Sequence, residues 1–162
     1  MYAKKLQPGE NAAYAVSRLM YEPHIYAALP DHLRDVFFAH RMLKEIESGD
    51  RMVFAVFCQS DNSFLGVVHG TMEGSEFVAH TMFRRKTNAV KAALLCQEQL
   101  EKFCRDNAIA LTAIVGYPPE HIRAAVIMNR RFGCIDCGPA KDVEFLSNGR
   151  PMPCRYFRKE IK

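Results

Sequence analysis

Apolar positions recur at helical spacing in the first third of the chain and at strand spacing in the next. Residues 10–20 and 32–48 each carry an apolar stripe with the period of an amphipathic helix, and a short helical piece is expected near residues 25–28. Asp31 is placed to cap the second long helix, and Gly49 follows its end, where a left-handed residue is least costly. The first 49 residues are therefore predicted to be mainly helical.

Three β-biased runs follow, over residues 51–58, 64–72 and 76–83. The connections at residues 59–63 and 73–75 are short and contain Ser, Asp, Asn or Gly, which are typical of turns. Consecutive strands joined by short turns pair antiparallel, because a parallel crossover needs a dozen or more residues. The pattern predicts an antiparallel meander of three strands.

Helices and strands alternate after the meander. A helix is predicted over residues 89–106 and a strand over residues 109–115. The strand is apolar almost throughout, which is typical of a strand buried on both faces in parallel pairing. A further helix is expected from Pro118 to about Arg131, since proline is favoured in the first turn of a helix.

The C-terminal part predicts a short extended segment and a closing hairpin. Residues 134–138 form the extended segment, and strands over residues 143–146 and 152–161 flank Asn148-Gly149, a dipeptide typical of tight hairpin turns. The whole order predicts a mixed α+β fold with a central, mostly antiparallel twisted sheet of six to seven strands and about four flanking helices. A chain of 162 residues is expected to form one domain, over residues 1–162.

Composition narrows the class of function. The net charge of +4 suits an anionic small-molecule ligand, but it is too small and too scattered for a nucleic-acid binder. No apolar run approaches the ~20 residues that a membrane helix needs, and the N-terminus lacks an apolar signal segment, so we expect a cytoplasmic protein. The six cysteines are expected to be reduced thiols. Cys134 and Cys137 form a CxxC without a second pair, so no metal is expected.

A cationic turn, Arg84-Arg85-Lys86-Thr87-Asn88-Ala89, joins the third strand to the following helix. Its three basic residues precede a helix start, where unpaired backbone N–H groups and the helix dipole favour negative charge. Thr87 or Asn88 can cap this helix. The combination predicts an anion site, most naturally for phosphate or pyrophosphate.

This turn resembles the cofactor-binding turn of the GNAT superfamily of N-acetyltransferases. In that family a strand ends in Arg/Gln-x-x-Gly-x-Gly/Ala, and the turn holds the pyrophosphate of acetyl-CoA. The chain matches at Arg84 and Ala89 and departs at Thr87, where glycine would allow close backbone approach and unusual dihedral angles. The predicted order of helices and strands is also the GNAT order, so the resemblance covers most of the chain.

The last helix adds a second point of resemblance. GNAT proteins end this helix with Asn-x-x-Ala-x-x-Leu-Tyr-x-x-x-Gly-Phe. Aligned on Gly133, the chain supplies Ala125 at the alanine position and Met128 in place of the leucine. Ile122 stands in place of the asparagine, and Asn129 stands in place of the tyrosine.

The resemblance implies an enzyme that transfers an acetyl group from acetyl-CoA to a primary amine of an unidentified acceptor. In the family two strands part around the cofactor, and a backbone N–H of the first strand binds the thioester oxygen as negative charge develops on it. The cofactor-binding residues that the resemblance implies are Thr81, Met82, Phe83, Arg84, Arg85, Lys86, Thr87, Asn88, Ala89, Ile122 and Asn129.

Transfer to an amine also needs a base and benefits from an acid for the leaving thiolate. The family's acid is the tyrosine that asparagine replaces here, and an asparagine cannot supply a proton at neutral pH. Histidine titrates near neutrality, which suits a base, although a structural or surface role is the alternative for each histidine. The candidate catalytic residues are His80, Tyr117, His121 and Asn129, with His69 as a further candidate base.

The departures at Thr87, Ile122 and Asn129 support an alternative, a GNAT-like structural or regulatory protein with weak or no catalysis. Residues 115–123 also resemble GNAT-like proteins of short-tailed phages, some of which are virion or morphogenesis components, so a phage or prophage origin fits this alternative. For the enzyme, the expected partners are acetyl-CoA and an amine acceptor, with no nucleic acid and no membrane. Many members of the family pair through sheet edges or terminal strands, so the resemblance allows a homodimer, but the sequence itself does not indicate the oligomeric state.

Overall fold

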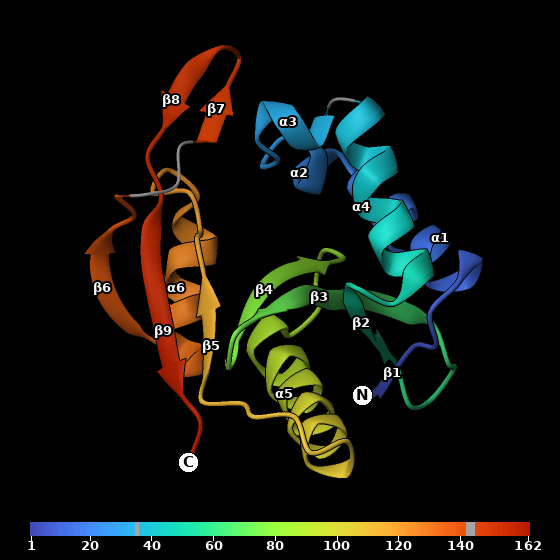
Figure 1. Cartoon of the computed structure of the whole chain (residues 1–162). Helices are drawn as coiled ribbons and strands as arrows, with labels where there is room; N and C mark the ends of the chain where they lie inside the picture. Colours follow the sequence, from blue (N-terminus) through green and yellow to red (C-terminus); the bar gives the residue numbers. More distant parts are fainter. Residues whose placement is uncertain (35, 142–144) are drawn as a thin grey trace.

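The computed structural model describes residues 1–34, 36–141 and 145–162 (Figure 1). Its centre is a seven-stranded sheet with the strand order β1-β2-β3-β4-β5-β9-β6. Among the described residues, no helix has both the length and the apolar composition needed to cross a bilayer. The strands of the sheet are β1 (Tyr2–Lys5), β2 (Met52–Phe57), β3 (Phe64–Glu73), β4 (Glu76–Phe83), β5 (Ala113–Gly116), β6 (Ile135–Pro139) and β9 (Arg155–Glu160).

The predicted antiparallel meander is confirmed by β2, β3 and β4. β4 then pairs with β5 in parallel, whereas β9 runs antiparallel to both β5 and β6. The sheet is therefore mostly antiparallel, and the predicted mixed α+β class is confirmed. The helices are α1 (Glu10–Met20), α2 (Pro23–Tyr26), α3 (Asp31–Arg34), α4 (Val36–Ser48), α5 (Ala89–Asp106) and α6 (Arg123–Phe132).

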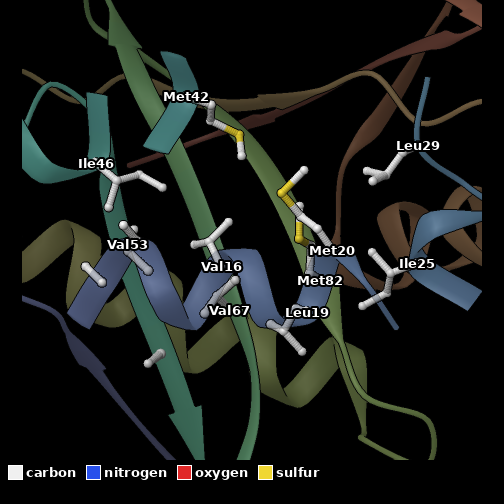
Figure 2. Packing of buried hydrophobic residues seen from close by; sticks show 13 residues of the cluster. Val16, Leu19, Met20, Ile25, Leu29, Met42, Ile46, Val53, Val67 and Met82 are labelled. Atoms are coloured by element: carbon white, nitrogen blue, oxygen red, sulfur yellow. The ribbon is translucent and has the colours of Figure 1, made fainter. Parts of the chain in front are cut away.

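Successive residues of each strand point to opposite faces of the sheet, and each face packs against its own helices. In β2, Val53 and Ala55 belong to a buried cluster with residues of α1, α2 and α4, which Figure 2 shows from close by. Phe54 and Val56 belong instead to a cluster built on α5, to which α6 contributes Phe132. We call these two sides the α1/α4 face and the α5 face.

Long helices with local start and stop signals have the predicted bounds. α5 spans the predicted residues 89–106, and the side chain of Asn88 caps it by accepting a hydrogen bond from the N–H of Lys91 at 3.1 Å. Gly49, with φ of 93°, follows the end of α4 as expected. The helix predicted over residues 32–48 corresponds to α3 and α4, and residue 35 between them lies outside the described residues.

The helix expected from Pro118 begins only at Arg123, so that boundary is wrong. The residues before it pair with a distant part of the chain instead of starting a helix. The N–H of Glu120 donates to the carbonyl of Pro153 at 2.9 Å, and the N–H of Arg155 donates to the carbonyl of Pro118 at 3.0 Å. Tertiary pairing therefore overrides the local proline signal.

The strand expected from Ile109 begins at Ala113, four residues later. Ile109 lies just past the end of α5 and is tied to it, because its N–H donates to the carbonyl of Cys104 at 2.8 Å. Thr112 is held by Ser75, whose carbonyl accepts its N–H at 2.8 Å. The expected parallel pairing of this strand is nevertheless confirmed by its pairing with β4.

The predicted Asn148-Gly149 turn is confirmed. It joins β7 (Phe145–Ser147) to β8 (Arg150–Met152), and its two residues have φ of 52° and 70°, as a type I′ turn requires. Both carboxylate oxygens of Asp31 accept the turn's N–H groups at 2.7 Å, which joins the hairpin to α3. Residues 143 and 144 of the predicted first strand lie outside the described residues. The predicted last strand is divided at residues 153–154 into β8 and β9.

Candidate functional site

The two parallel strands of the sheet part after three residues. β4 and β5 are in register from Glu76 opposite Ala113 to Val78 opposite Val115, and β4 then continues to Phe83 without a described partner on that side. A strand that loses its neighbour leaves backbone N–H and C=O groups unpaired. The sheet is therefore open between β4 and β5. The opening lies at the C-terminal end of β4, where the cationic turn begins.

A cavity of about 590 Å³ passes through this opening and is lined from both faces of the sheet. On the α5 face its wall includes Ala93, Cys96 and Leu100 of α5. On the α1/α4 face it includes Met42 of α4 and His69 of β3. One cavity thus connects two chambers across the sheet, which suits a reaction between two ligands that enter from opposite sides.

The backbone of β4 presents hydrogen-bond donors to the opening. The N–H of Arg84 donates to the carbonyl of Leu65 at 2.9 Å, so this opposite pair of residues is hydrogen-bonded. Bonded and non-bonded pairs alternate along an antiparallel ladder. Counting back along β4, Phe83 and Thr81 direct their N–H groups away from β3 and toward the opening, whereas Met82 faces β3. Thr81 is the donor nearest the middle of the opening.

The cationic turn is a tight reverse turn followed by a capped helix. The N–H of Thr87 donates to the carbonyl of Arg84 at 3.1 Å, and Lys86 has φ of 70°, which together are typical of a type II turn. The left-handed residue is thus Lys86 and not Thr87, the position where the family has glycine. The hydroxyl of Thr87 donates to the carbonyl of Leu65 at 3.3 Å, which ties the turn to β3.

Backbone N–H groups gather at this turn without partners among the described residues. The side chain of Asn88 accepts a hydrogen bond from the N–H of Lys91. The regular helical bonds begin with Ala92, whose N–H donates to the Asn88 carbonyl at 2.9 Å. Converging unpaired N–H groups at a helix start form an anion site. The unpaired N–H groups are those of Arg85, Lys86, Asn88, Ala89 and Val90.

The cations of the turn differ in their surroundings. Nε of Arg84 lies 3.2 Å from Oε1 of Glu22, close enough for an ion pair although the angle is not that of a hydrogen bond. Arg85 and Lys86 are exposed and form no ion pair with a described residue. The guanidinium that matches the family motif is thus held by the α1–α2 corner, and the next two cations are available to an anion.

His24, which no pattern in the sequence singles out, lines the cavity. Its Nε2 donates to the carbonyl of Phe83 at 3.0 Å, and its Nδ1 lies 3.9 Å from a carboxylate oxygen of Glu22. The α1–α2 corner is thereby fastened to the end of β4 by His24 and to the cationic turn by the Glu22–Arg84 pair. The residues are about 60 positions apart, so no local pattern could have indicated the contact.

Two candidate bases, His80 and His69, lie side by side on the α1/α4 face. They are opposite one another on β4 and β3, and their rings stack with centroids 5.3 Å apart. Both line the cavity, and His80 follows Ala79, the first residue of β4 beyond the last parallel pair. Burial lowers the pKa of His69 well below its ordinary value, and the nearby charges of His80 and Arg51 lower it further.

The remaining candidates divide into two groups. Tyr117 follows β5, lines the cavity and stacks on Tyr156 with ring centroids 5.5 Å apart. Asn129 and Ile122 also line the cavity; Ile122 is the residue before α6 rather than part of a longer helix. His121 is exposed on the turn before α6, and it is not part of the cavity wall.

The Asn129 side chain is hydrogen-bonded to groups in α6 and just after it. Its Nδ2 donates to the carbonyl of Ala125 at 2.9 Å, and its Oδ1 accepts a weak bond from the thiol of Cys134 at 3.9 Å. Its oxygen also lies close to Gly116 of β5, since a Cβ at that glycine would be 3.6 Å from it. The side chain therefore directs its acceptor oxygen toward β5.

The thiols at the site are not nucleophiles. Burial raises the pKa of Cys96 to about 12 and that of Cys134 to about 11, so both remain protonated at neutral pH. All six cysteines are free. Among the described residues, no three His, Cys, Asp or Glu side chains are grouped to hold a metal ion. Among the described residues of the cavity wall, the groups suited to acid, base or hydrogen-bond chemistry are the backbone, histidine and tyrosine groups described above.

No sequence-family model and no curated protein sequence matches the chain. Solved structures do match. The chain is similar to an acetyltransferase of Salmonella typhimurium that modifies the N-terminal serine of the 50S ribosomal subunit protein L7/L12. The TM-score is 0.74 at 14% identity, and the match covers 100% of this chain and 96% of that chain.

Two further similar structures contain ligands. The microcin C7 self-immunity acetyltransferase, solved with acetyl-CoA and AMP, has a TM-score of 0.69 at 13% identity over 99% of this chain and 93% of that chain. The spermidine N-acetyltransferase of Vibrio cholerae, solved with CoA and spermine, has a TM-score of 0.70 at 14% identity over 98% and 95%. At these identities the likeness concerns the fold, and the chain has the fold of these GNAT-type N-acetyltransferases over almost its whole length.

Proposed function

We propose that the protein is a cytoplasmic N-acetyltransferase that moves the acetyl group of acetyl-CoA to a primary amine. The observation that carries this proposal is the opening between β4 and β5, with a cavity that reaches both faces of the sheet. A thioester arm placed between the two strands would bring its acetyl group to the boundary between the two chambers. The GNAT fold and the bound CoA in similar structures support the same choice of cofactor.

The α5 face holds the cofactor in this proposal. The pyrophosphate binds the unpaired N–H groups at the start of α5 together with Arg85 and Lys86. Ala89 and Ile122 of the cavity wall would flank the pantetheine arm on its way into the opening. The N–H of Thr81 stabilises the charge that develops on the thioester oxygen.

The α1/α4 face holds the acceptor. His80 accepts the proton that the attacking amine loses, and the new C–N bond forms as the C–S bond of the thioester breaks. Tyr117 donates its hydroxyl proton to the leaving thiolate and is reprotonated from water. Asn129 offers an acceptor oxygen beside β5, which favours the thiol over the thiolate after this proton transfer.

The departures at Thr87, Ile122 and Asn129 support a second candidate, a GNAT-like protein with weak or no catalysis, such as a phage or prophage structural component. The observation in its favour is the Asn129 amide, which is bonded to its own helix where the family has a proton donor. This candidate predicts at most CoA binding, without acetyl transfer.

Thermal unfolding with and without acetyl-CoA tests the proposal, because a ligand that binds the native state alone raises the melting temperature. We expect a rise at about millimolar acetyl-CoA and release of CoA thiol when amine mixtures are added. Stabilisation without thiol release from any amine would support the second candidate. The absence of stabilisation would contradict both the cofactor and the enzyme assignment.

A further inference from the structure

His69 is a buried polar side chain for which no described residue supplies a hydrogen bond. It is 1% exposed, and neither Nδ1 nor Nε2 has a hydrogen-bond partner among the described residues. A buried polar group without a hydrogen-bond partner destabilises the folded state, and an apolar side chain of similar shape would avoid this cost. Since His69 lines the cavity, a ligand atom is a partner that could recover this free energy.

Arg51 brings a second donor to the same region of the α1/α4 face. Its Nε and Nη2 each lie 3.1 Å from Oε2 of Glu45, so Nη1 remains without a described partner. Arg51 lines the cavity and is close enough to His69 to lower the pKa of that imidazole, after burial as the larger cause. His69 is therefore neutral at pH 7, with one N–H donor.

The charge of this chamber is unsuited to a polycation. Among the residues that the structure describes, the wall on the α1/α4 face carries the basic side chains Arg51, His24, His69 and His80 and one carboxylate, Glu73. Glu73 lies four residues along β3 from His69, roughly 13 Å away at the rise of a strand. A second ammonium group beside the reacting amine would meet the Arg51 guanidinium, and the carboxylate next to it, Glu45, is already paired with that guanidinium.

The rest of the chamber is apolar and adaptable. Met20, Met42 and Met82 extend into the layer between α1, α4 and the sheet (Figure 2). Met42 and Met82 line the cavity, together with Ile25 and Leu29 of the α1–α3 region. Unbranched methionine side chains repack readily, so they can admit an apolar group and expose the edge of the His69 ring to it.

We propose that His69 and Arg51 form a subsite for an oxygen atom, carboxylate or carbonyl, that the acceptor carries beside its primary amine. The acceptor's body is apolar, and it carries no second ammonium group. The inference rests on the proposed function and specifies its substrate class. Because His69 and His80 stack on adjacent strands, an acceptor amine bound at His80 would have its oxygen close by at His69.

The direct test observes His69 itself. The ring ¹⁵N signals of His69 are recorded in CoA-saturated protein while apolar α-amino acids (leucine, methionine, phenylalanine), their amides or the matching decarboxylated amines are added. We expect the α-amino acids or their amides to move the His69 signals, and the decarboxylated amines and spermidine to leave them in place. A stronger response to amides identifies a peptide-like acceptor, and a stronger response to free acids identifies an amino acid.

A variant separates binding from a structural role. His69→Phe keeps a buried aromatic ring but removes both nitrogens, and its CoA-induced stabilisation verifies the fold. We expect KM for leucine or its amide to rise about tenfold, and to rise much more than KM for 3-methylbutylamine, which has no oxygen for His69 to bind. His69→Gln, which retains a donor, should restore part of the affinity.

Equal responses of His69 to leucine and 3-methylbutylamine, or no response to any probe in CoA-bound protein, would overturn the subsite. If CoA fails to bind, the proposed function fails separately, and the ¹⁵N titration of the CoA-free protein still decides whether His69 binds an acceptor oxygen.

Discussion

The two chambers on either side of the sheet are built from different kinds of group. On the α5 face, the groups that meet the proposed cofactor are mostly backbone: the N–H of Thr81 and the N–H groups of the cationic turn. On the α1/α4 face, the polar groups are side chains, chiefly Arg51, His69 and His80. The polar groups of the chamber on the α5 face are thus main-chain N–H groups, whereas those of the chamber on the α1/α4 face are side chains.

This difference explains which departures from the family pattern are tolerable. Thr87 replaces a family glycine without adopting a left-handed conformation, because Lys86 is the left-handed residue of the turn. A backbone site survives such a change. An acceptor site made of side chains does not survive a change of residue type, so it is the chamber where specificity is expected to differ among proteins of this fold.

The largest expected effect is the loss of kcat when the proposed base on the α1/α4 face is removed. His80→Gln removes the proposed base and should lower kcat by about a hundredfold or more, while stabilisation by acetyl-CoA stays unchanged. His40→Gln, an exposed histidine of α4, is the matched control and should retain full activity. Steady-state kinetics together with thermal unfolding measure both quantities. Full activity in His80→Gln would remove this residue from the mechanism.

The complementary change should weaken the cofactor instead. Arg85→Gln combined with Lys86→Gln removes two exposed cations and keeps the backbone, so acetyl-CoA affinity should fall by about ten- to a hundredfold. Lys102→Gln with Arg105→Gln removes the same charge from the opposite end of α5 and controls for net charge. Calorimetric titration with CoA compares the two. Equal losses in both variants would mean that general charge, rather than the turn, attracts the cofactor.

A smaller effect tests the helix start that organises the anion site. Asn88→Ala removes the side chain that caps α5, which should lower the free energy of unfolding by about 1 kcal/mol. Chemical denaturation measures this loss. Asn107→Ala removes a side chain that donates to the Phe103 carbonyl at the other end of α5, and serves as comparison. A negligible loss in Asn88→Ala would show that the turn is held by its contacts with β3 alone.

The smallest effect concerns the strands beyond the opening. Hydrogen bonds from Arg155 and Arg130 lower the pKa of Asp136 on β6 to about 2. Because the folded value lies below the unfolded one, near 3.8, the stabilisation is present above pH 4 and is lost as the pH falls toward 2. Asp136→Asn should remove this part of the pH dependence. An unchanged acid limb in the variant would contradict the assignment.

The sequence predicted those parts of the fold that are specified by neighbouring residues. α5 has a cap at Asn88, and the hairpin turn has Asn148-Gly149, so both agree with their predictions. The starts of α6 and β5 were wrong because Glu120 and Thr112 pair with residues more than thirty positions away. Such long-range pairing has no local signature.

The same limit applies to the candidate site. Periodicity placed His80 and the cationic turn on successive elements, and the structure brings both to the opening. It did not indicate that Glu22 would hold Arg84, or that Arg51 would lie near His69, because each contact joins elements from different parts of the chain. The cofactor-side residues were therefore easier to identify than the acceptor-side residues.

A crystal structure of the protein with CoA would show whether a thioester arm lies between β4 and β5, as we propose. We expect a diphosphate on the N–H groups of residues 85–90 and a pantetheine arm beside Thr81, ending near His80. A diphosphate bound elsewhere, or an opening filled by protein side chains while CoA lies on another surface, would contradict it.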